Sequence, residues 1–164
     1  MNWKALKYLL PFVFFVLAYF AMHQTCWVVF LPVLAAFVVV PILELLFKPN
    51  ATNLSDAEET MAKADPVYDW ILYLVVPLQF ITLYWFLSGI TDVSLHWWEV
   101  AGRVASMSLM CGTFGINVAH ELGHRNTRHE QWIAKALLLT SLYSHFFIEH
   151  NKGHHKHVST PRRP

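Results

Sequence analysis

Long apolar runs constrain the fold of this chain more than any other feature. Four of them follow one another, at residues 6–22, 27–47, 70–90 and 97–120. Each is close to the ~20 residues that an α-helix needs to cross the apolar core of a bilayer. Of the 164 residues, 55% are hydrophobic and only 14% are charged, whereas soluble domains carry about 25% charged residues. Backbone groups in lipid must be satisfied within their own segment, so the sequence predicts an all-α, polytopic membrane protein with about four transmembrane helices.

The apolar runs are arranged as one membrane domain over residues 1–164. The first run lacks the small-residue cleavage site of a secretory signal and another apolar run follows at once, so we expect an uncleaved helix. A short link at residues 22–26 predicts an antiparallel hairpin. Prolines at positions 32 and 41 predict kinks in the second helix. In the polar segment 48–69, Ser55 and Glu58 form a capping-box pattern that predicts a short surface helix.

Charge indicates the orientation. The net charge of +1 gives no reason to expect a nucleic-acid partner. Lysines and arginines gather in alternate connecting segments, while the links at 22–26 and 91–96 contain none. The positive-inside rule therefore places the N-terminus and the segment after residue 120 in the cytoplasm. Arg103 is the exception, and we expect it to pair with Glu99 one turn away or to snorkel to the interface.

The fourth apolar run carries small residues at spacings of three and four. This pattern predicts close helix–helix packing, and it is also compatible with a narrow apolar corridor for a substrate. The residues are Ala101, Ala105, Ser108, Gly112, Gly115 and Ala119.

Two histidine clusters follow the apolar runs. His120 and His124 lie in HELGH, and His150, His154 and His155 lie in EHNKGHH. Neutral imidazole nitrogens are common ligands of transition metals. A spacing of four residues places two histidines on one face of a helix, about one turn apart. The sequence therefore predicts a metal site at the membrane surface.

The first cluster alone matches the HExxH motif of zinc metalloproteases. In that interpretation His120 and His124 bind zinc and Glu121 is the general base. A tetrahedral zinc ion does not use five histidines, whereas two metal ions sharing a nitrogen-rich cage do. The isolated histidines are interpreted as ordinary polar residues, except that His145 is a candidate neighbour of the metal ligands.

The apolar segment 132–148 separates the two clusters. If it crossed the membrane, His150 and His120 would lie on opposite faces and would not share a metal site. Lysines and arginines after this segment also argue against a crossing. We therefore predict an interfacial or re-entrant helix that bears the second cluster.

HELGHR followed by EHNKGHHKHVSTP resembles the first two histidine boxes of the alkane 1-monooxygenases, or alkane hydroxylases. These are integral-membrane, non-haem di-iron enzymes related to fatty-acid desaturases. The continuation Val158 to Pro161 favours the hydroxylases over the desaturases, and the stretch Val39 to Glu44 is similar to the end of their second helix. The resemblance covers essentially the whole chain.

The resemblance implies a function and its components. Members of the family bind two Fe ions, use O2 as co-substrate and receive electrons from rubredoxin and rubredoxin reductase. They hydroxylate the terminal methyl group of medium-chain alkanes to primary alcohols in the cell inner membrane, among membrane lipid. The implied iron ligands are His120, His124, His150, His154 and His155, with Glu121 and Glu149 as candidates that orient imidazoles.

The chain departs from the family in two respects. It ends in Pro161-Arg162-Arg163-Pro164, where an acidic residue usually precedes the second proline. The later histidine motifs of the family do not occur, so we expect an N-terminal fragment that is inactive alone. The alternatives are a membrane zinc endopeptidase, a fatty-acid desaturase or lipid hydroxylase, and a non-enzymatic metal transporter.

Overall fold

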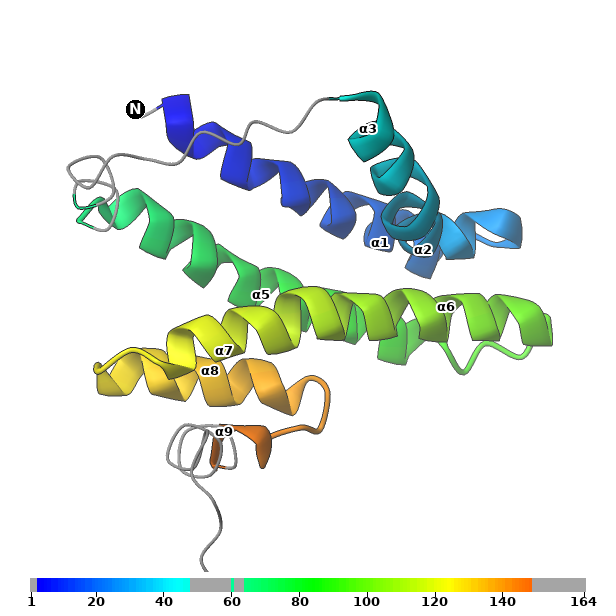
Figure 1. Cartoon of the computed structure of the whole chain (residues 1–164). Coiled ribbons are helices and arrows are strands. Elements are labelled where there is room, and N and C mark those ends of the chain that lie inside the picture. The colour runs from blue at the N-terminus through cyan, green and yellow to red at the C-terminus, as the bar shows by residue number, and fades with distance from the viewer. Residues whose placement is uncertain (1–2, 48–59, 61–63, 149–164) are drawn as a thin grey trace, which may run out of the picture. The chain divides into compact units, whose positions relative to one another are not determined.

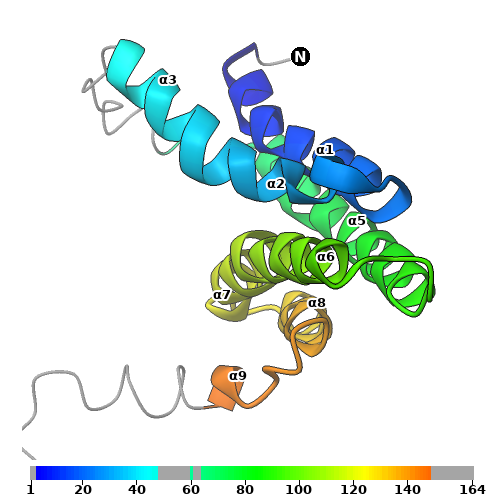
Figure 2. The ribbon, with the colours of Figure 1, turned by 90° about the vertical axis from the view of Figure 1, so that its right-hand side faces the viewer.

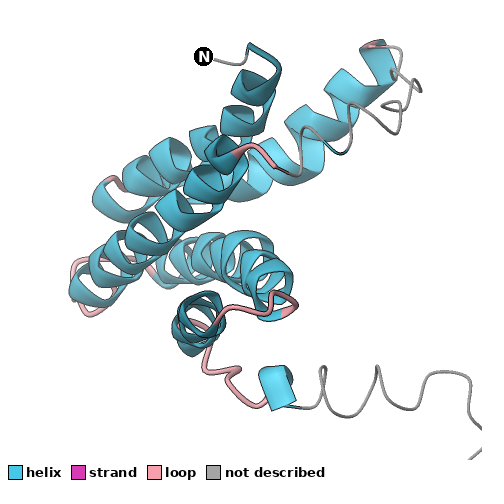
Figure 3. Cartoon of the chain, turned by 90° about the vertical axis from the view of Figure 1, so that its left-hand side faces the viewer, coloured by secondary structure: helices cyan, strands magenta, loops and turns pink. Residues whose placement is uncertain are grey.

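A computed structural model describes residues 3–47, 60 and 64–148. The described residues form helices and connecting turns and contain no strand, which confirms the all-helical prediction (Figure 3). The chain divides into two compact units, Met1–Met110 and Cys111–Pro164. Of the surface helix predicted after Ser55, the structure describes residue 60, which is helical.

The first unit begins with two apolar helical stretches. A 3-10 segment, η1 (Trp3–Phe12), leads into α1 (Val13–His23). After a turn the chain continues through η2 (Cys26–Phe30), α2 (Leu31–Leu34), η3 (Ala35–Val39) and α3 (Val40–Leu46), which form one helical rod in Figure 2.

Both prolines of this rod lie where its helical geometry changes. Pro32 is in the first turn of α2, directly after the 3-10 segment η2, and Pro41 is in the first turn of α3. The π-helical segment η3 precedes Pro41. Proline has no N–H for the helical ladder, and a widened turn is a common way to accommodate it. Both prolines therefore coincide with changes of helix type, and the kinks themselves stay a prediction.

The long helix α5 (Pro66–Gly89) begins at a well-formed cap. Asp65 accepts a hydrogen bond from the N–H of Val67 at 3.0 Å, and Pro66 occupies the first helical position, where no N–H partner is required. The following helix of this unit is α6 (Trp97–Met110). Helix α1 packs against both α5 and α6, and it runs beside α5 in Figure 1.

Two helical stretches among the described residues are long and apolar enough to cross a membrane. They are Cys26–Leu46, with a mean hydropathy of 2.7, and Pro66–Gly89, with 1.8; Lys7–His23 is apolar but shorter. Large apolar side chains are exposed along the first of these stretches, with Leu45 87% exposed. A lipid environment explains such exposure, and the protein is accordingly a membrane protein. The count of four spans stays a prediction.

The close-packed face of α6 differs from the predicted small-residue stripe. Ala101 and Ser108 of that stripe are exposed. The tightest contact is at Gly102, where an added Cβ would lie 2.4 Å from Cγ2 of Val29. The hydroxyl of Ser106, one turn along, donates to the carbonyl oxygen of Val29 at 2.7 Å. The stripe prediction was therefore wrong for α6, because the face of α6 that meets η2 is rotated by one residue.

Arg103 is buried, with 5% of its surface exposed. Its guanidinium donates to the carbonyl oxygens of Gly89 at 2.9 Å and Gln24 at 3.0 Å, near the ends of α5 and α1. The Glu99 carboxylate accepts hydrogen bonds from the N–H groups of Cys26 and His96 at 2.6 and 2.8 Å. The two charged residues thus satisfy backbone groups at helix ends, which carry complementary partial charges.

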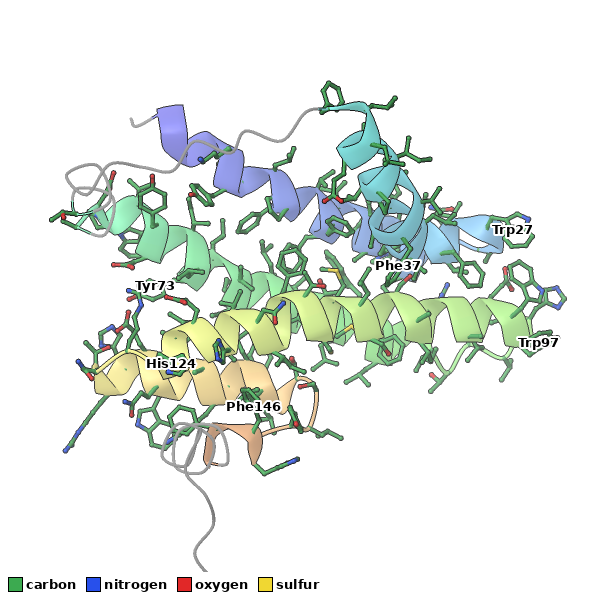
Figure 4. All side chains as sticks on the ribbon, viewed as in Figure 1. Trp27, Phe37, Tyr73, Trp97, His124 and Phe146 are labelled. Atoms are coloured by element: carbon green, nitrogen blue, oxygen red, sulfur yellow. The ribbon has the colours of Figure 1, made fainter. Side chains whose placement is uncertain are left out.

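Aromatic side chains border the same end of this unit. The ring centroids of Trp27 and Trp98 are 5.7 Å apart, and His96 stacks on Trp98 at 6.1 Å. Trp27 and Trp97 are 75% and 81% exposed, and Figure 4 shows both at this end. Exposed tryptophans at the ends of apolar helices are typical of the membrane–water interface.

The second unit consists of η4 (Cys111–Ile116), α7 (Asn117–Gly123), α8 (Arg128–Leu139) and the short α9 (Phe146–Ile148). Helix α7 packs against α8. The predicted helix over 132–148 is not continuous. Its helix begins earlier, at Arg128, and ends at Leu139.

The end of α8 has a recognisable cause. Leu142 adopts φ 55°, and the N–H groups of Leu142 and Tyr143 bind the carbonyls of Leu139 and Leu138. This is the Schellman pattern, which closes a helix by reversing the chain. Glycine usually occupies the left-handed position. Because leucine occupies it here, the sequence did not predict where this helix ends.

Candidate metal centre

Helix α7 brings the first two predicted ligands together. The Nε2 atoms of His120 and His124 are 3.0 Å apart, and their ring centroids are 4.5 Å apart. His120 is half-buried and His124 is exposed. The motif spacing predicted this arrangement, because residues four apart lie on one face of a helix.

The separation of these nitrogens suits a shared metal ion. An imidazole nitrogen lies about 2.0–2.1 Å from a bound zinc ion, so two ligands of one ion must lie within about 4.2 Å of each other. The observed 3.0 Å meets this condition without rearrangement. Two imidazoles alone do not complete a site, and the described part of the chain contains no cluster of three or more histidine, cysteine, aspartate or glutamate residues able to hold a metal ion.

Glu121 is directed toward a cation. Its carboxylate lies 4.0 Å from the guanidinium of Arg125, and its side chain is 60% exposed. An ion pair this exposed contributes little to stability. This contact therefore does not fix the Glu121 carboxylate in place.

The turn after His124 is held by the first turn of α8. Glu130, buried at 4% exposure, accepts hydrogen bonds from Arg125 Nη1 at 3.1 Å and from the hydroxyl of Thr127. The side-chain amide of Gln131 donates to the carbonyl oxygen of Arg125 at 3.0 Å. This cluster was not among the predicted site residues. The signal was present, since Thr127 and Glu130 have the spacing of a capping box.

Gly123, inside HELGH, allows a third element to approach. An added Cβ there would lie 3.4 Å from the Phe147 ring of α9 and 3.9 Å from Ala134 of α8. The Phe146 ring lies 6.2 Å from the His120 ring, and His124 and Phe146 are both labelled in Figure 4. The ammonium group of Lys135 lies over the Phe147 ring at 4.7 Å from its centroid. Helix α9 is thus packed beside the histidine pair.

The remaining predicted ligands lie outside the described residues. These are His150, His154 and His155, together with Glu149 as an orienting residue. The described part of the chain stops at Ile148, immediately before them. His145, the candidate neighbour of the ligands, is exposed, and its ring centroid lies 4.6 Å from that of Tyr143.

The fold and the motif define a class: a helical membrane protein that carries an HExxH helix with its two imidazoles facing each other. No family model matches the chain. The chain is 32% identical over 144 residues to an alkane 1-monooxygenase of Pseudomonas putida, covering 87% of the chain and 36% of the relative. It is 35% identical over 163 residues to alkane 1-monooxygenase 1 of Pseudomonas aeruginosa, covering 97% and 42%.

A third relative is alkane 1-monooxygenase 1 of Alcanivorax borkumensis, 28% identical over 151 residues, which cover 91% of the chain and 37% of the relative. These comparisons confirm the resemblance to the alkane 1-monooxygenases that the histidine motifs predicted. The chain spans about two fifths of the length of these relatives or less.

Proposed function

We propose that the chain forms part of a membrane monooxygenase that hydroxylates the terminal methyl group of medium-chain alkanes. The overall reaction consumes the alkane, O2, two electrons and two protons, and yields a primary alcohol and water. Rubredoxin, reduced by rubredoxin reductase, is the proposed electron donor. The observation that carries the proposal is the imidazole pair of His120 and His124, 3.0 Å apart, in a chain whose relatives are named alkane 1-monooxygenase.

The proposed iron ligands of this chain are His120, His124, His150, His154 and His155. Bound iron would supply the oxidising chemistry, as cofactors generally do in such enzymes. The chain's own residues bind it through neutral imidazole nitrogens. Glu121 and Glu149 would orient imidazoles by accepting their second N–H, which fixes the tautomer.

The short separation along the chain between α9 and the second cluster supports a shared site. Phe146 lies beside His120, and His150 follows it by four residues. Consecutive Cα atoms are about 3.8 Å apart, so four residues span at most ~15 Å. The second cluster therefore begins within reach of the first.

The substrate has no polar group, so its recognition rests on apolar shape and on exclusion of water. A bilayer concentrates such molecules, and the two long apolar helices place the chain there. We propose that the histidines lie on the cytoplasmic side of the inner membrane, following the positive-inside rule.

A chimeric enzyme tests the function. The segment of the Pseudomonas putida relative that matches this chain is replaced by the chain's residues, and membranes are supplied with octane, rubredoxin, rubredoxin reductase and NADH. We expect 1-octanol, and its loss in the His154→Ala variant. A chimera that folds, binds iron and forms no octanol would contradict the assignment, and conversion of a fatty acid instead would favour a desaturase or lipid hydroxylase.

Metal analysis separates the main alternative. The purified chain should take up iron, and uptake should fall when His124 is replaced by alanine. One zinc ion and no iron would favour a membrane zinc endopeptidase that uses His120, Glu121 and His124. Histidines that line a water-filled path across the membrane would instead favour a transporter.

The native cysteines test the orientation. Cys26 is exposed in the link after α1, whereas Cys111 is half-buried. In intact spheroplasts, a membrane-impermeant thiol reagent should label Cys26, and Cys26→Ser should remove that label. Labelling of Cys26 only after the membrane is opened would reverse the proposed orientation.

A further inference from the structure

We infer that Glu130 is a positioning residue for the histidine pair, and that it acts on His124 through Arg125. The inference rests on the proposed metal centre for its functional meaning. The geometry that carries it belongs to the turn between α7 and α8, within a single compact unit.

Glu130 is a buried carboxylate that accepts hydrogen bonds from two residues of this turn. Only 4% of it is exposed, and it accepts hydrogen bonds from Arg125 Nη1 and from the hydroxyl of Thr127. An ionised carboxylate is costly to bury unless it is paired and hydrogen-bonded. The turn must therefore keep both donors in place for α8 to begin where it does.

Hydrogen bonds hold both the side chain and the backbone of Arg125. Its guanidinium binds Glu130 at 3.1 Å, and its carbonyl oxygen accepts from the Gln131 side-chain amide at 3.0 Å. Its N–H donates to the carbonyl oxygen of Leu122 at 3.3 Å. The contact of Arg125 with Glu121 is longer, at 4.0 Å, and more exposed. The buried carboxylate is therefore the stronger anchor.

His124 directly precedes Arg125 and caps the C-terminal end of α7. Helix α7 continues directly from η4, and the last turn of a helix frays unless other groups hold it. Anchoring Arg125 holds the backbone of His124, whose N–H binds the carbonyl oxygen of His120 at 3.3 Å. Glu130 thus keeps the imidazole of His124 facing the imidazole of His120.

The test follows the histidine pair with and without metal, using the full chain in detergent. Co²⁺ serves as the probe metal and its affinity is read from its visible absorption. In the metal-free protein, side-chain ¹⁵N signals report the hydrogen bond between His120 and His124. Glu130→Gln keeps the volume and removes the charge. We expect it to weaken Co²⁺ binding about tenfold and to alter both imidazole signals, while far-UV circular dichroism stays unchanged.

Four further variants make the test specific. Arg128→Gln changes an exposed charge in the same turn of α8 and should alter neither readout. Arg125→Gln should match Glu130→Gln, and the double variant should be no worse than either, because the two residues act as one unit. Thr127→Val removes one donor to the carboxylate and should weaken Co²⁺ binding by less than Glu130→Gln does. It serves as the test variant if Glu130→Gln unfolds the chain.

The outcomes separate this inference from the proposed function. If Glu130→Gln changes neither Co²⁺ affinity nor the imidazole signals, the positioning role is refuted, and a metal centre that still depends on His124 stands. If the unsubstituted chain binds no Co²⁺ but its imidazole signals respond to Glu130→Gln, the positioning role is supported and the proposed metal centre is refuted. Additive effects of Arg125→Gln and Glu130→Gln would also refute action through Arg125.

Discussion

The contact at Gly102 makes a quantitative prediction about packing in the first unit. In Gly102→Ala the new methyl group would lie 2.4 Å from Cγ2 of Val29 and 2.9 Å from Cζ of Phe30. Carbon atoms pack at about 3.5–4.0 Å, so the helices must separate by roughly 1 Å or the side chains must move. Val29 has no exposed surface, and its carbonyl oxygen is bound by Ser106, which limits its movement.

The expected cost follows from these constraints. Overpacking a well-filled core costs about 1–3 kcal/mol, and the upper end applies because Val29 is restrained. Alanine recovers up to about 1 kcal/mol of helix propensity. Gly102→Ala should therefore lower the free energy of unfolding by about 2 kcal/mol. Gly112→Ala is the matched control: a Cβ there meets nothing within 4 Å, so that variant should be neutral or slightly stabilised.

The assay is unfolding of the purified chain by increasing SDS in mixed micelles, followed by circular dichroism. A rescue variant isolates the contact, because Val29→Ala removes the clashing methyl group. We expect the double variant Gly102→Ala/Val29→Ala to be more stable than the sum of the single changes predicts, with a coupling of about 1 kcal/mol or more. Additive effects, or a Gly102→Ala chain as stable as Gly112→Ala, would refute the reasoning.

Three further predictions concern the turn after α8, the HELGH motif and the buried Arg103. Leu142→Gly should stabilise the chain by up to about 1 kcal/mol in the same titration, because the φ of 55° favours glycine and the leucine side chain is 84% exposed; destabilisation would show that the exposed leucine makes a necessary contact. Gly123→Leu should displace Phe147 and weaken Co²⁺ binding, whereas Gly123→Ala, whose Cβ meets the ring at 3.4 Å, should be tolerated; equal binding by both variants would contradict this. Arg103→Met should lower the free energy of unfolding by about 2–3 kcal/mol because two carbonyl oxygens lose a charged donor, and an unchanged midpoint would show that water replaces it.

The helical part of the fold was predictable because apolar runs near the length of a membrane crossing leave the backbone few options. The second and third predicted spans agree closely with the helical stretches Cys26–Leu46 and Pro66–Gly89. The facing histidines were also predictable, since a spacing of four residues brings two side chains together on any helix. Local periodicity carries both kinds of information.

The contacts between elements were not predictable in the same way. Gly102, rather than the stripe of small residues, meets Val29, because the rotation of α6 about its axis depends on which neighbour it packs against. The end of α8 depends on Leu142 in a left-handed conformation. Leucine is not a residue type from which that conformation is predicted. The buried Arg103 donates to carbonyl oxygens at the ends of two other helices. The partners of Gly102 and Arg103 lie on other elements of the chain.

The sequence by itself determined that this protein is helical, that it belongs in a membrane and that it pairs His120 with His124. Each of these properties depends on composition or on spacing within one helix. The tertiary structure alone decided which face of α6 is buried, how α9 reaches the histidine pair across Gly123, and how Glu130 holds the turn after His124. Those properties depend on side chains from separate elements that meet only after the chain has packed.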